Sequence, residues 1–331
     1  MSDPCLPGEF EIIRRYFMQR QRDDAGIVLG QGDDCALLSP TPGCRLAVSV
    51  DTSLADVHFP LEAPAEAIGH RALAVNLSDL AAMGARPRWF VLALTLAEVD
   101  ESWLADFAHG LYSLARQHDI ALVGGDITRG RELSMTITVH GELPAEAGIT
   151  RCGARPGDLL AVTGALGGAH GGLRAWFDGE RSADNPLLDA YLRPRPRVDA
   201  GIALRDLVSA GLDISDGLLA DLRHLCDGAG TGARLDAEAI PLAPGLVAAL
   251  GADQALQAAL GGGDDYQLLV ALPPQNEAAA RRALGGALHV IGHVTSEPGI
   301  QGVSLKSPGW QHFYNSASGS GAAPNGHGEH P

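Results

Sequence analysis

The sequence contains almost no lysine. Lys306 is the only lysine among 24 basic residues, and the others are arginines. A phosphate-binding loop of the Walker type needs a Gly-Lys-Ser/Thr tripeptide, which this chain lacks. A protein kinase needs a lysine on an early strand, whereas Lys306 lies near the C-terminus. If the protein handles polyphosphates, metal ions held by carboxylates must therefore supply most of the positive charge.

Positive charge, patterned cysteines and long apolar runs are also scarce. The formal net charge of −16 argues against a nucleic-acid or anionic-membrane surface. No apolar run approaches the roughly 18 residues of a membrane span, and no secretory signal is visible. The five cysteines (5, 35, 44, 152 and 226) show no metal-binding spacing, which is typical of free thiols in a reducing compartment. We therefore expect a cytoplasmic protein with no nucleic-acid partner and no membrane partner.

The length and the punctuation of the chain predict two domains. A chain of 331 residues is long for a single core. A boundary is expected within 149–164, where Gly153, Pro156 and Gly157 directly precede a new strand at 158–163. We expect an N-terminal domain over 1–148 and a C-terminal domain over 149–315. Residues 316–331 have almost nothing apolar to bury and are expected to be a disordered tail.

Strand-like and helix-like patterns alternate along both halves. In the first half we expect helices at 64–84 and 101–119, among strands at 44–52, 87–96, 120–128 and 133–143. In the second half we expect an acidic loop and helix within 210–230, and strands at 158–163, 266–272 and 287–294. This order predicts an α/β (α+β) protein built from two α/β sandwiches in series.

Aspartates recur beside glycine or small polar residues at the edges of apolar segments. This placement is typical of ligands fixed on a rigid scaffold. Each aspartate alone is more often a turn former or a helix cap, and Asp216 could be only the N-cap of the helix that follows it. The aspartates in this setting are Asp33, Asp34, Asp51, Asp126, Asp213, Asp216, Asp264 and Asp265.

Asp79 is harder to explain as a turn or cap, because it falls inside a predicted helix. Its neighbours on the same helical face are Val75, Asn76, Ala82 and Met83, so the helix would bury a carboxylate. A salt bridge with Arg86 could satisfy it, or other polar partners could do so in the core. Otherwise burial would raise its pKa, and a divalent cation would keep the acid ionised.

The chemistry of this acidic set favours magnesium. Aspartate oxygens without a histidine and cysteine cluster suit Mg²⁺ or Mn²⁺ rather than zinc or copper. Five or more separated acids exceed the needs of one ion, so we expect two or more, as phosphoryl transfer requires. The neighbours Asp33 and Asp34 point to opposite sides of an extended segment, so one ion is not expected to bind both side chains.

Two further motifs have a functional and a structural interpretation. The segment "GALGGAHGGL" (164–173) could cradle a phosphate through backbone N–H groups, although close backbone packing is the more common role of such glycines. The segment "RPRPR" (193–197) could bind an anion or form a solvated turn. The sequence leaves both alternatives open.

Several motifs recur in a fixed order over residues 8 to about 314. The most specific are "NLSDLAAMGA", "GGD" with "TRG", and "DISDG". The others, in chain order, are "GEFEIIRRYF", "GQGDDCALL", "VSVDTSLADVHF", "RPGDLLAVTG", "LRPRPR" and "GGGDDYQLL". Taken together, these motifs resemble the thiamine-monophosphate kinase family, which belongs to a superfamily with aminoimidazole-ribonucleotide synthetase, selenophosphate synthetase and a hydrogenase-maturation protein.

The resemblance implies a homodimer whose N-terminal sheets form a barrel. It also implies the transfer of phosphate from ATP to thiamine monophosphate, which gives ADP and thiamine diphosphate. The implied Mg²⁺ ligands are Asp34, Ser49, Asp51, Asp79, Asp126, Asp213 and Asp216. The implied nucleotide contacts are Gly125, Asp126, Arg151 and Ser215, and the implied substrate contacts are His58, Asp264 and Trp310. No catalytic residue is implied beyond the metal ligands.

Three residues depart from the family pattern. Val50 stands where threonine is common, so only its backbone carbonyl could reach a metal. Asp264 replaces the usual glutamate, which shortens its reach by one methylene. His109 stands where some members have a tyrosine that contacts ATP.

We expect direct in-line transfer, because the acceptor phosphate has a second pKa of about 6 and needs little help from a base. Two alternatives remain. One is another ATP-dependent synthetase of the superfamily, although a selenophosphate synthetase would need a lysine near Cys5. The other is a non-catalytic regulator that binds Mg²⁺ and nucleotide.

Overall fold

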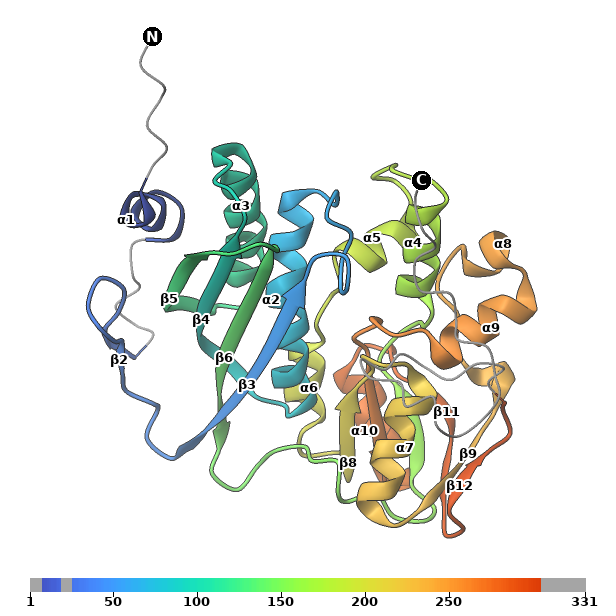
Figure 1. The fold of residues 1–331 in the computed structure, drawn as a ribbon. Coiled ribbons are helices and arrows are strands. Elements are labelled where there is room, and N and C mark those ends of the chain that lie inside the picture. Colours follow the sequence, from blue (N-terminus) through green and yellow to red (C-terminus); the bar gives the residue numbers. More distant parts are fainter. Residues whose placement is uncertain (1–7, 19–25, 305–331) are drawn as a thin grey trace, which may run out of the picture.

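The computed structural model describes residues 8–18 and 26–304, and these contain two main β-sheets (Figure 1). The sheet of the first half has four strands in the order β3 (Cys44–Leu54), β6 (Ser134–Pro144), β4 (Arg86–Leu96) and β5 (Ala121–Arg129). Strand β6 pairs antiparallel with both β3 and β4, whereas β4 and β5 are parallel. Strands β3 and β5 are therefore the two edges of this sheet.

Helices α2 (Ala65–Ala82) and α3 (Glu101–Gln117) cover one face of the four-stranded sheet (Figure 1). The side chains of Phe90, Leu94 and Met135, which lie on the strands of this sheet, are almost completely buried. The opposite face of edge strand β3 is open: the side chains of Val48 and Val50 are each 57% exposed. One face of this sheet thus forms a core, and the other presents apolar side chains to the outside.

The six-stranded sheet of the second half is covered on both faces. On one face Val270 packs in the same core cluster as the helices α6 (Val198–Leu204) and α10 (Glu277–Ala283). On the other face Leu269 packs with α7 (Leu218–Ala229) and α9 (Ala252–Gly261). The strand order is β12 (Gly299–Gln301), β9 (Gly232–Leu235), β11 (His289–Thr295), β7 (Leu159–Val162), β10 (Leu268–Leu272), β8 (Ala210–Asp213).

Short elements complete the fold. They are α1 (Glu9–Ile12) with a π-helical turn (Ile13–Phe17), the hairpin β1 (Ile27–Leu29) and β2 (Leu37–Leu38), the helices α4 (Gly168–Phe177), α5 (Pro186–Leu192) and α8 (Leu246–Leu250), and two 3₁₀ turns (Ala237–Ala239 and Pro274–Asn276).

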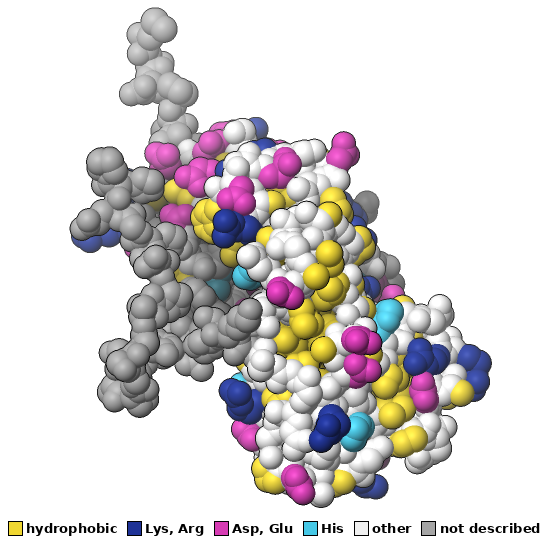
Figure 2. Space-filling model, turned by 90° about the vertical axis from the view of Figure 1, so that its right-hand side faces the viewer, with side chains coloured by type: hydrophobic (Ala, Val, Ile, Leu, Met, Phe, Trp, Pro, Cys, Tyr) yellow, Lys and Arg dark blue, Asp and Glu magenta, His cyan; other side chains and the backbone are white. Residues whose placement is uncertain are grey.

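On the face of the molecule shown in Figure 2, Lys and Arg side chains are scattered and do not gather into a basic patch. No helix among the described residues is long and apolar enough to cross a membrane.

Glycines let helix α2 pack very closely against its neighbours. A Cβ atom on Gly69 would meet the Phe107 carbonyl oxygen, and one on Gly110 would meet the Glu66 carbonyl oxygen. A Cβ atom on Gly201 in α6 would likewise meet the carbonyl oxygen of Ala81. Helix α2 therefore touches α3 and α6 backbone to backbone, and it lies between the two halves of the chain.

The expected mixed α/β architecture and most of the expected elements are confirmed. The strands and helices expected within 44–143 all exist, with ends that differ by three residues or fewer. The short strands β8, β9 and β12 were not predicted individually. The structure contains one copy of the chain, so the barrel across a homodimer stays a prediction, as do the domain limits. Cys5, Trp310 and the tail at 316–331 lie outside the described residues.

Replacing Gly110 by alanine should destabilise the protein, because the added methyl group would overlap the Glu66 carbonyl oxygen of α2. We expect a loss of about 1–3 kcal/mol in the free energy of unfolding, measured by urea denaturation. The control is Gly124→Ala, where the new Cβ would lie at an ordinary 3.8 Å from Val91 Cγ1. Equal stabilities of the two variants would contradict this account of the α2–α3 contact.

Candidate active site

Helix α2 binds an acidic cluster through three polar contacts to other elements. The hydroxyl of Ser49, on β3, donates a hydrogen bond of 2.5 Å to Asp79 Oδ2. The backbone N–H of Asp51, also on β3, donates to Asn76 Oδ1 at 3.1 Å. The hydroxyl of Ser78 donates to Oδ2 of Asp213, at the end of β8, at 2.7 Å. Four predicted ligands (Ser49, Asp51, Asp79 and Asp213) are thus held together around one helix.

The carboxylates of this cluster repel one another. Burial, followed by the charges of Asp79 and Asp213, raises the pKa of Asp51 to about 6. Burial and the charge of Asp79 raise the pKa of Asp213 to about 6. Burial also raises the pKa of Asp79, although the Ser49 hydroxyl and the Arg151 guanidinium oppose the shift. A bound cation would relieve this repulsion.

A cavity of about 220 Å³ opens onto the cluster between β3, α2 and β8. Ser49, Asp79 and Asp213 line it together with Arg151, and Leu80 and Met83 form an apolar side. No ion pair joins Asp79 to Arg86 in the part of the chain that the structure describes. The partners of Asp79 are the Ser49 hydroxyl and the nearby Arg151. The predicted salt bridge with Arg86 is therefore wrong, whereas the alternative of other polar partners agrees with the Ser49 hydrogen bond.

The loop after β8 is held by Asp221, a residue that the sequence analysis did not identify. Asp221 Oδ2 accepts hydrogen bonds from the backbone N–H groups of Ser215 (3.0 Å), Asp216 (3.1 Å) and Gly217 (3.1 Å). The N-cap of α7 is Gly217, and no side chain caps the helix. The interpretation of Asp216 as a mere helix cap is therefore wrong, and its carboxylate is free of that task. The sequence signal for Asp221 was an acidic residue among the apolar side chains of the segment "GLLADL" (217–222).

Two predicted substrate contacts lie beside a buried arginine, Arg71 of α2. Asp264 Oδ1 forms an ion pair of 2.7 Å with Arg71 Nη2. Arg71 Nη1 also donates to the backbone carbonyl of Tyr191 at 2.7 Å, and the Tyr191 hydroxyl lies 3.4 Å from the His58 carbonyl oxygen. His58 and Asp264 are thus connected through Tyr191 and Arg71. Arg71 was not predicted from the sequence, although an arginine directly before the apolar run "ALAVNL" (72–77) was a visible signal.

The glycine-rich segment 164–173 does not offer a free phosphate cradle. Asp265 accepts hydrogen bonds from the N–H groups of Gly167 (2.6 Å) and Ala169 (3.3 Å) at the start of α4. A Cβ atom on Gly172 would meet the Leu187 carbonyl oxygen, which confirms the packing interpretation. In "RPRPR", the first two arginines form ion pairs with Glu66 and Asp189, and the third donates to Gln267.

Three further predicted residues, Asp34, Gly125 and Asp126, lie away from strand β3 and from the acidic cluster. Asp126 and Gly125 are on β5, the edge opposite β3, and Asp34 lies in the loop between β1 and β2 (Figure 1). Gly125 has φ +156°, and a Cβ atom there would meet the Leu92 carbonyl oxygen, so the strand needs glycine. Asp33 Oδ1 accepts the N–H of Asp34 at 2.9 Å. Among the described residues, no three acidic, histidine or cysteine side chains converge as a ready metal site.

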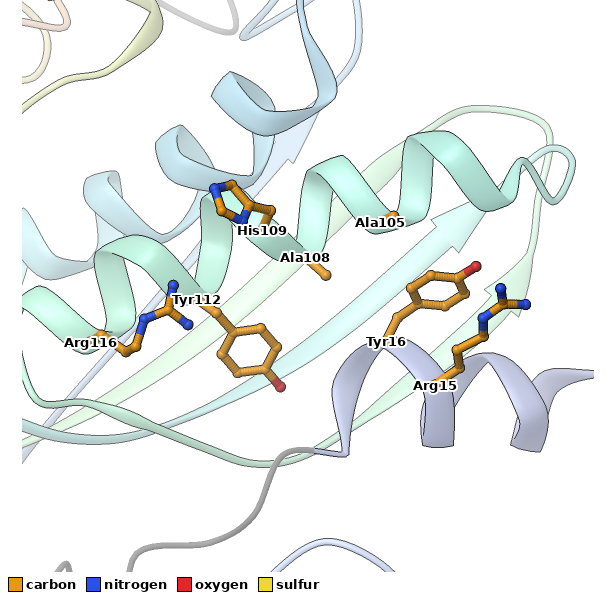
Figure 3. A pocket seen from close by; sticks show the side chains of 7 residues that line it. All are labelled: Arg15, Tyr16, Ala105, Ala108, His109, Tyr112 and Arg116. Atoms are coloured by element: carbon orange, nitrogen blue, oxygen red, sulfur yellow. The ribbon is translucent and has the colours of Figure 1, made fainter.

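A second cavity, of about 260 Å³, lies between the N-terminal helical segment and α3 (Figure 3). Arg15 and Tyr16 of the N-terminal segment line it together with His109, Tyr112 and Arg116 of α3. It contains none of the predicted metal ligands. His109, which departs from the family pattern, therefore lines a different cavity from the one that opens onto the acidic cluster.

The raised pKa values predict how stability depends on pH and magnesium. The folded protein holds protons on Asp51 and Asp213 up to about pH 6, whereas the unfolded chain releases them near its ordinary pKa of 3.8. Without divalent cations, Tm should therefore fall as the pH rises from about 5 to about 7.5. Added MgCl₂ should raise Tm more at the higher pH, where the carboxylates are ionised.

The control for this experiment is NaCl of matched ionic strength, which screens the net charge without binding the cluster. The variant Asp213→Asn should show a smaller magnesium effect at high pH. A magnesium-induced rise in Tm that is the same at both pH values, or unchanged in Asp213→Asn, would contradict the cation-binding role of the cluster.

Comparisons with known proteins identify the family of the chain. The models for AIR synthase related proteins match residues 32–143 with the N-terminal domain and 155–304 with the C-terminal domain. Thiamine-monophosphate kinase of Escherichia coli is 42% identical over 322 residues, which cover 92% of this chain and 98% of that protein. The crystal structure of thiamine-monophosphate kinase from Stenotrophomonas maltophilia K279a has a TM-score of 0.81 at 42% identity, covering 84% of this chain and 92% of that one.

A solved structure described as AaThiL complexed with AMPPCP and TMP has a TM-score of 0.76 at 29% identity. It covers 83% of this chain and 89% of its own. The matches thus extend over both halves of the chain and over nearly the full length of the relatives. The chain belongs to the thiamine-monophosphate kinase family, whose members are kinases that act on a phosphate acceptor.

Proposed function

We propose that this protein transfers a phosphoryl group from ATP to thiamine monophosphate in a magnesium-dependent, direct in-line reaction. The observation that carries the proposal is the acidic cluster of Asp51, Asp79 and Asp213, of which Asp79 and Asp213 line a cavity together with Arg151. A related structure at 29% identity is described with an ATP analogue and TMP bound, which supports the choice of both substrates. The reaction would take place in the cytoplasm.

The donor set fits magnesium. It consists of carboxylate and hydroxyl oxygens, and burial together with neighbouring carboxylates raises the pKa of Asp51 and of Asp213 to about 6. When bound, Mg²⁺ would neutralise charge on the phosphates of both substrates. The residues proposed to hold it are Asp34, Ser49, Asp51, Asp79, Asp126, Asp213 and Asp216.

The chain's own residues would bind and orient the two anions. Arg151 lies on the cavity and offers a fixed positive charge to the ATP phosphates. Ser215 and Gly125 are the further proposed nucleotide contacts. Asp221 holds the Ser215–Gly217 loop through three hydrogen bonds, so Ser215 and Asp216 keep their places. Because the acceptor phosphate is already ionised at neutral pH, no side chain is needed as a base.

The strand order supports a site shared between two copies of the chain. Asp126 and Asp51 lie on opposite edges of a four-stranded sheet, and three strand spacings amount to about 14 Å. One copy alone therefore does not bring Asp126 to Asp51. We propose that β3 of one copy pairs with β5 of the other in a closed barrel. The exposed face of Val48 and Val50 would then become interior, and Asp126 of the partner subunit would complete the acidic cluster.

The thiamine part of the substrate is proposed to bind near His58, Asp264 and Trp310. The ion pair with Arg71 balances the charge of Asp264, so Asp264 would contribute as a hydrogen-bond acceptor more than as a counter-charge to the thiazolium. Trp310 is proposed to stack on a ring of the substrate.

Incubation of the protein with Mg-ATP and thiamine monophosphate should yield ADP and thiamine diphosphate in equal amounts, measured by chromatography. Asp79→Asn and Asp126→Asn should reduce kcat by several orders of magnitude, because each removes a proposed magnesium ligand. Circular dichroism should show that both variants keep the fold.

The absence of thiamine diphosphate would overturn the proposed function. ATP consumption with another acceptor would then favour a different synthetase of the superfamily, and magnesium and nucleotide binding without turnover would favour a regulator. Near-normal activity of Asp126→Asn would overturn the assignment of the metal ligands.

A further inference from the structure

Arg71 is a buried cation whose guanidinium group joins two segments of the second half of the chain. Its side chain is only 4% exposed. One nitrogen, Nη2, forms the 2.7 Å ion pair with Asp264, and the other, Nη1, donates to the Tyr191 carbonyl at 2.7 Å. The guanidinium carbon also lies 4.8 Å from the centre of the Tyr191 ring. Both terminal nitrogens of the planar group thus have a partner, one on each of the two segments.

The segment that carries Asp264 has an unusual backbone. Asp264 has φ +67° and Tyr266 has φ +48°, which lie in the left-handed region that residues other than glycine rarely adopt. The N–H of Asp264 donates to the Ser215 carbonyl at 2.8 Å, and the Tyr266 hydroxyl donates to Asp264 Oδ1 at 3.0 Å. Together with Arg71, these bonds hold the aspartate in one orientation despite the strain.

Both side-chain bonds end on the same carboxylate oxygen, Oδ1. The Asp264 side chain nevertheless remains 31% exposed. The aspartate is therefore anchored through one oxygen, while part of the carboxylate still faces outward. This is the arrangement of a group that is fixed in order to present its second oxygen to a ligand.

We propose that Arg71 is a positioning residue that determines the affinity for thiamine monophosphate, by anchoring Oδ1 of Asp264 so that Oδ2 accepts a hydrogen bond from the thiamine part of the substrate. Arg71 and Asp264 act as a matched pair: the aspartate is one methylene shorter than the usual glutamate, and the long guanidinium side chain meets it. The proposal rests on the proposed kinase function. It concerns the thiamine end of the site and not the ATP end.

The test compares Arg71→Lys, Asp264→Glu and the double variant in steady-state kinetics with Mg-ATP and thiamine monophosphate. Each single variant should raise KM for thiamine monophosphate about tenfold, because the lengths of the pair no longer match. KM for ATP should stay within about twofold of the wild-type value. In the double variant the longer acid meets the shorter base, and KM for thiamine monophosphate should return to within about threefold of wild type.

Arg193→Lys is the matched control, because Arg193 also joins α2 to the second half, through its 2.7 Å ion pair with Glu66, without touching Asp264. Its kinetics should match wild type. Asp264→Asn is the second variant, to be used if Arg71→Lys or Asp264→Glu folds poorly. It keeps the size of the side chain and one oxygen acceptor for Arg71, but it removes the second acceptor that is proposed to bind the substrate. It should also raise KM for thiamine monophosphate selectively.

The inference would be overturned by an unchanged KM for thiamine monophosphate in Arg71→Lys, by an equal rise in both KM values, or by single effects that simply multiply in the double variant. These results differ from a failure of the proposed function itself. In that case the wild-type protein would form no thiamine diphosphate at all.

Discussion

Helix α2 must bury polar side chains in the middle of the molecule, and the rest of the structure is arranged to satisfy them. Arg71, Asn76 and Ser78 are at most 3% exposed. A buried polar group without a partner costs a few kcal/mol, and a buried charge costs more, so each needs a specific partner. Asp264, the Asp51 N–H and Asp213 are these partners, and each lies on a different segment.

This constraint explains how segments distant in sequence come to form one site. The close backbone contacts at Gly69, Gly110 and Gly201 fix α2 against α3 and α6. The polar side chains of α2 then fix β3, β8 and the loop around Asp264 relative to the helix. The acidic cluster and the proposed thiamine end are thus held by one rigid element, which is how preorganised electrostatic catalysis keeps its geometry.

Much of this organisation was predictable from local patterns. The strands and helices between residues 44 and 143 followed from hydrophobic periodicity, and the burial of Asp79 followed from its helical neighbours. Asp221 and Arg71 were missed, and the role of Asp265 was not predicted, because their partners are backbone groups or residues far away in the sequence. No local pattern reports such contacts. The short strands β8, β9 and β12 carry too few residues to show a period.

The position of Asp126 shows a different limit. Its motif predicts a ligand, but which edge of the sheet it occupies depends on strand order. Subunit complementation tests the shared site most directly. Mixed dimers of Asp79→Asn and Asp126→Asn subunits, with a different tag on each, should contain one intact site per dimer and regain about half of the wild-type activity. Mixed dimers as inactive as either parent would contradict a site completed by the partner subunit.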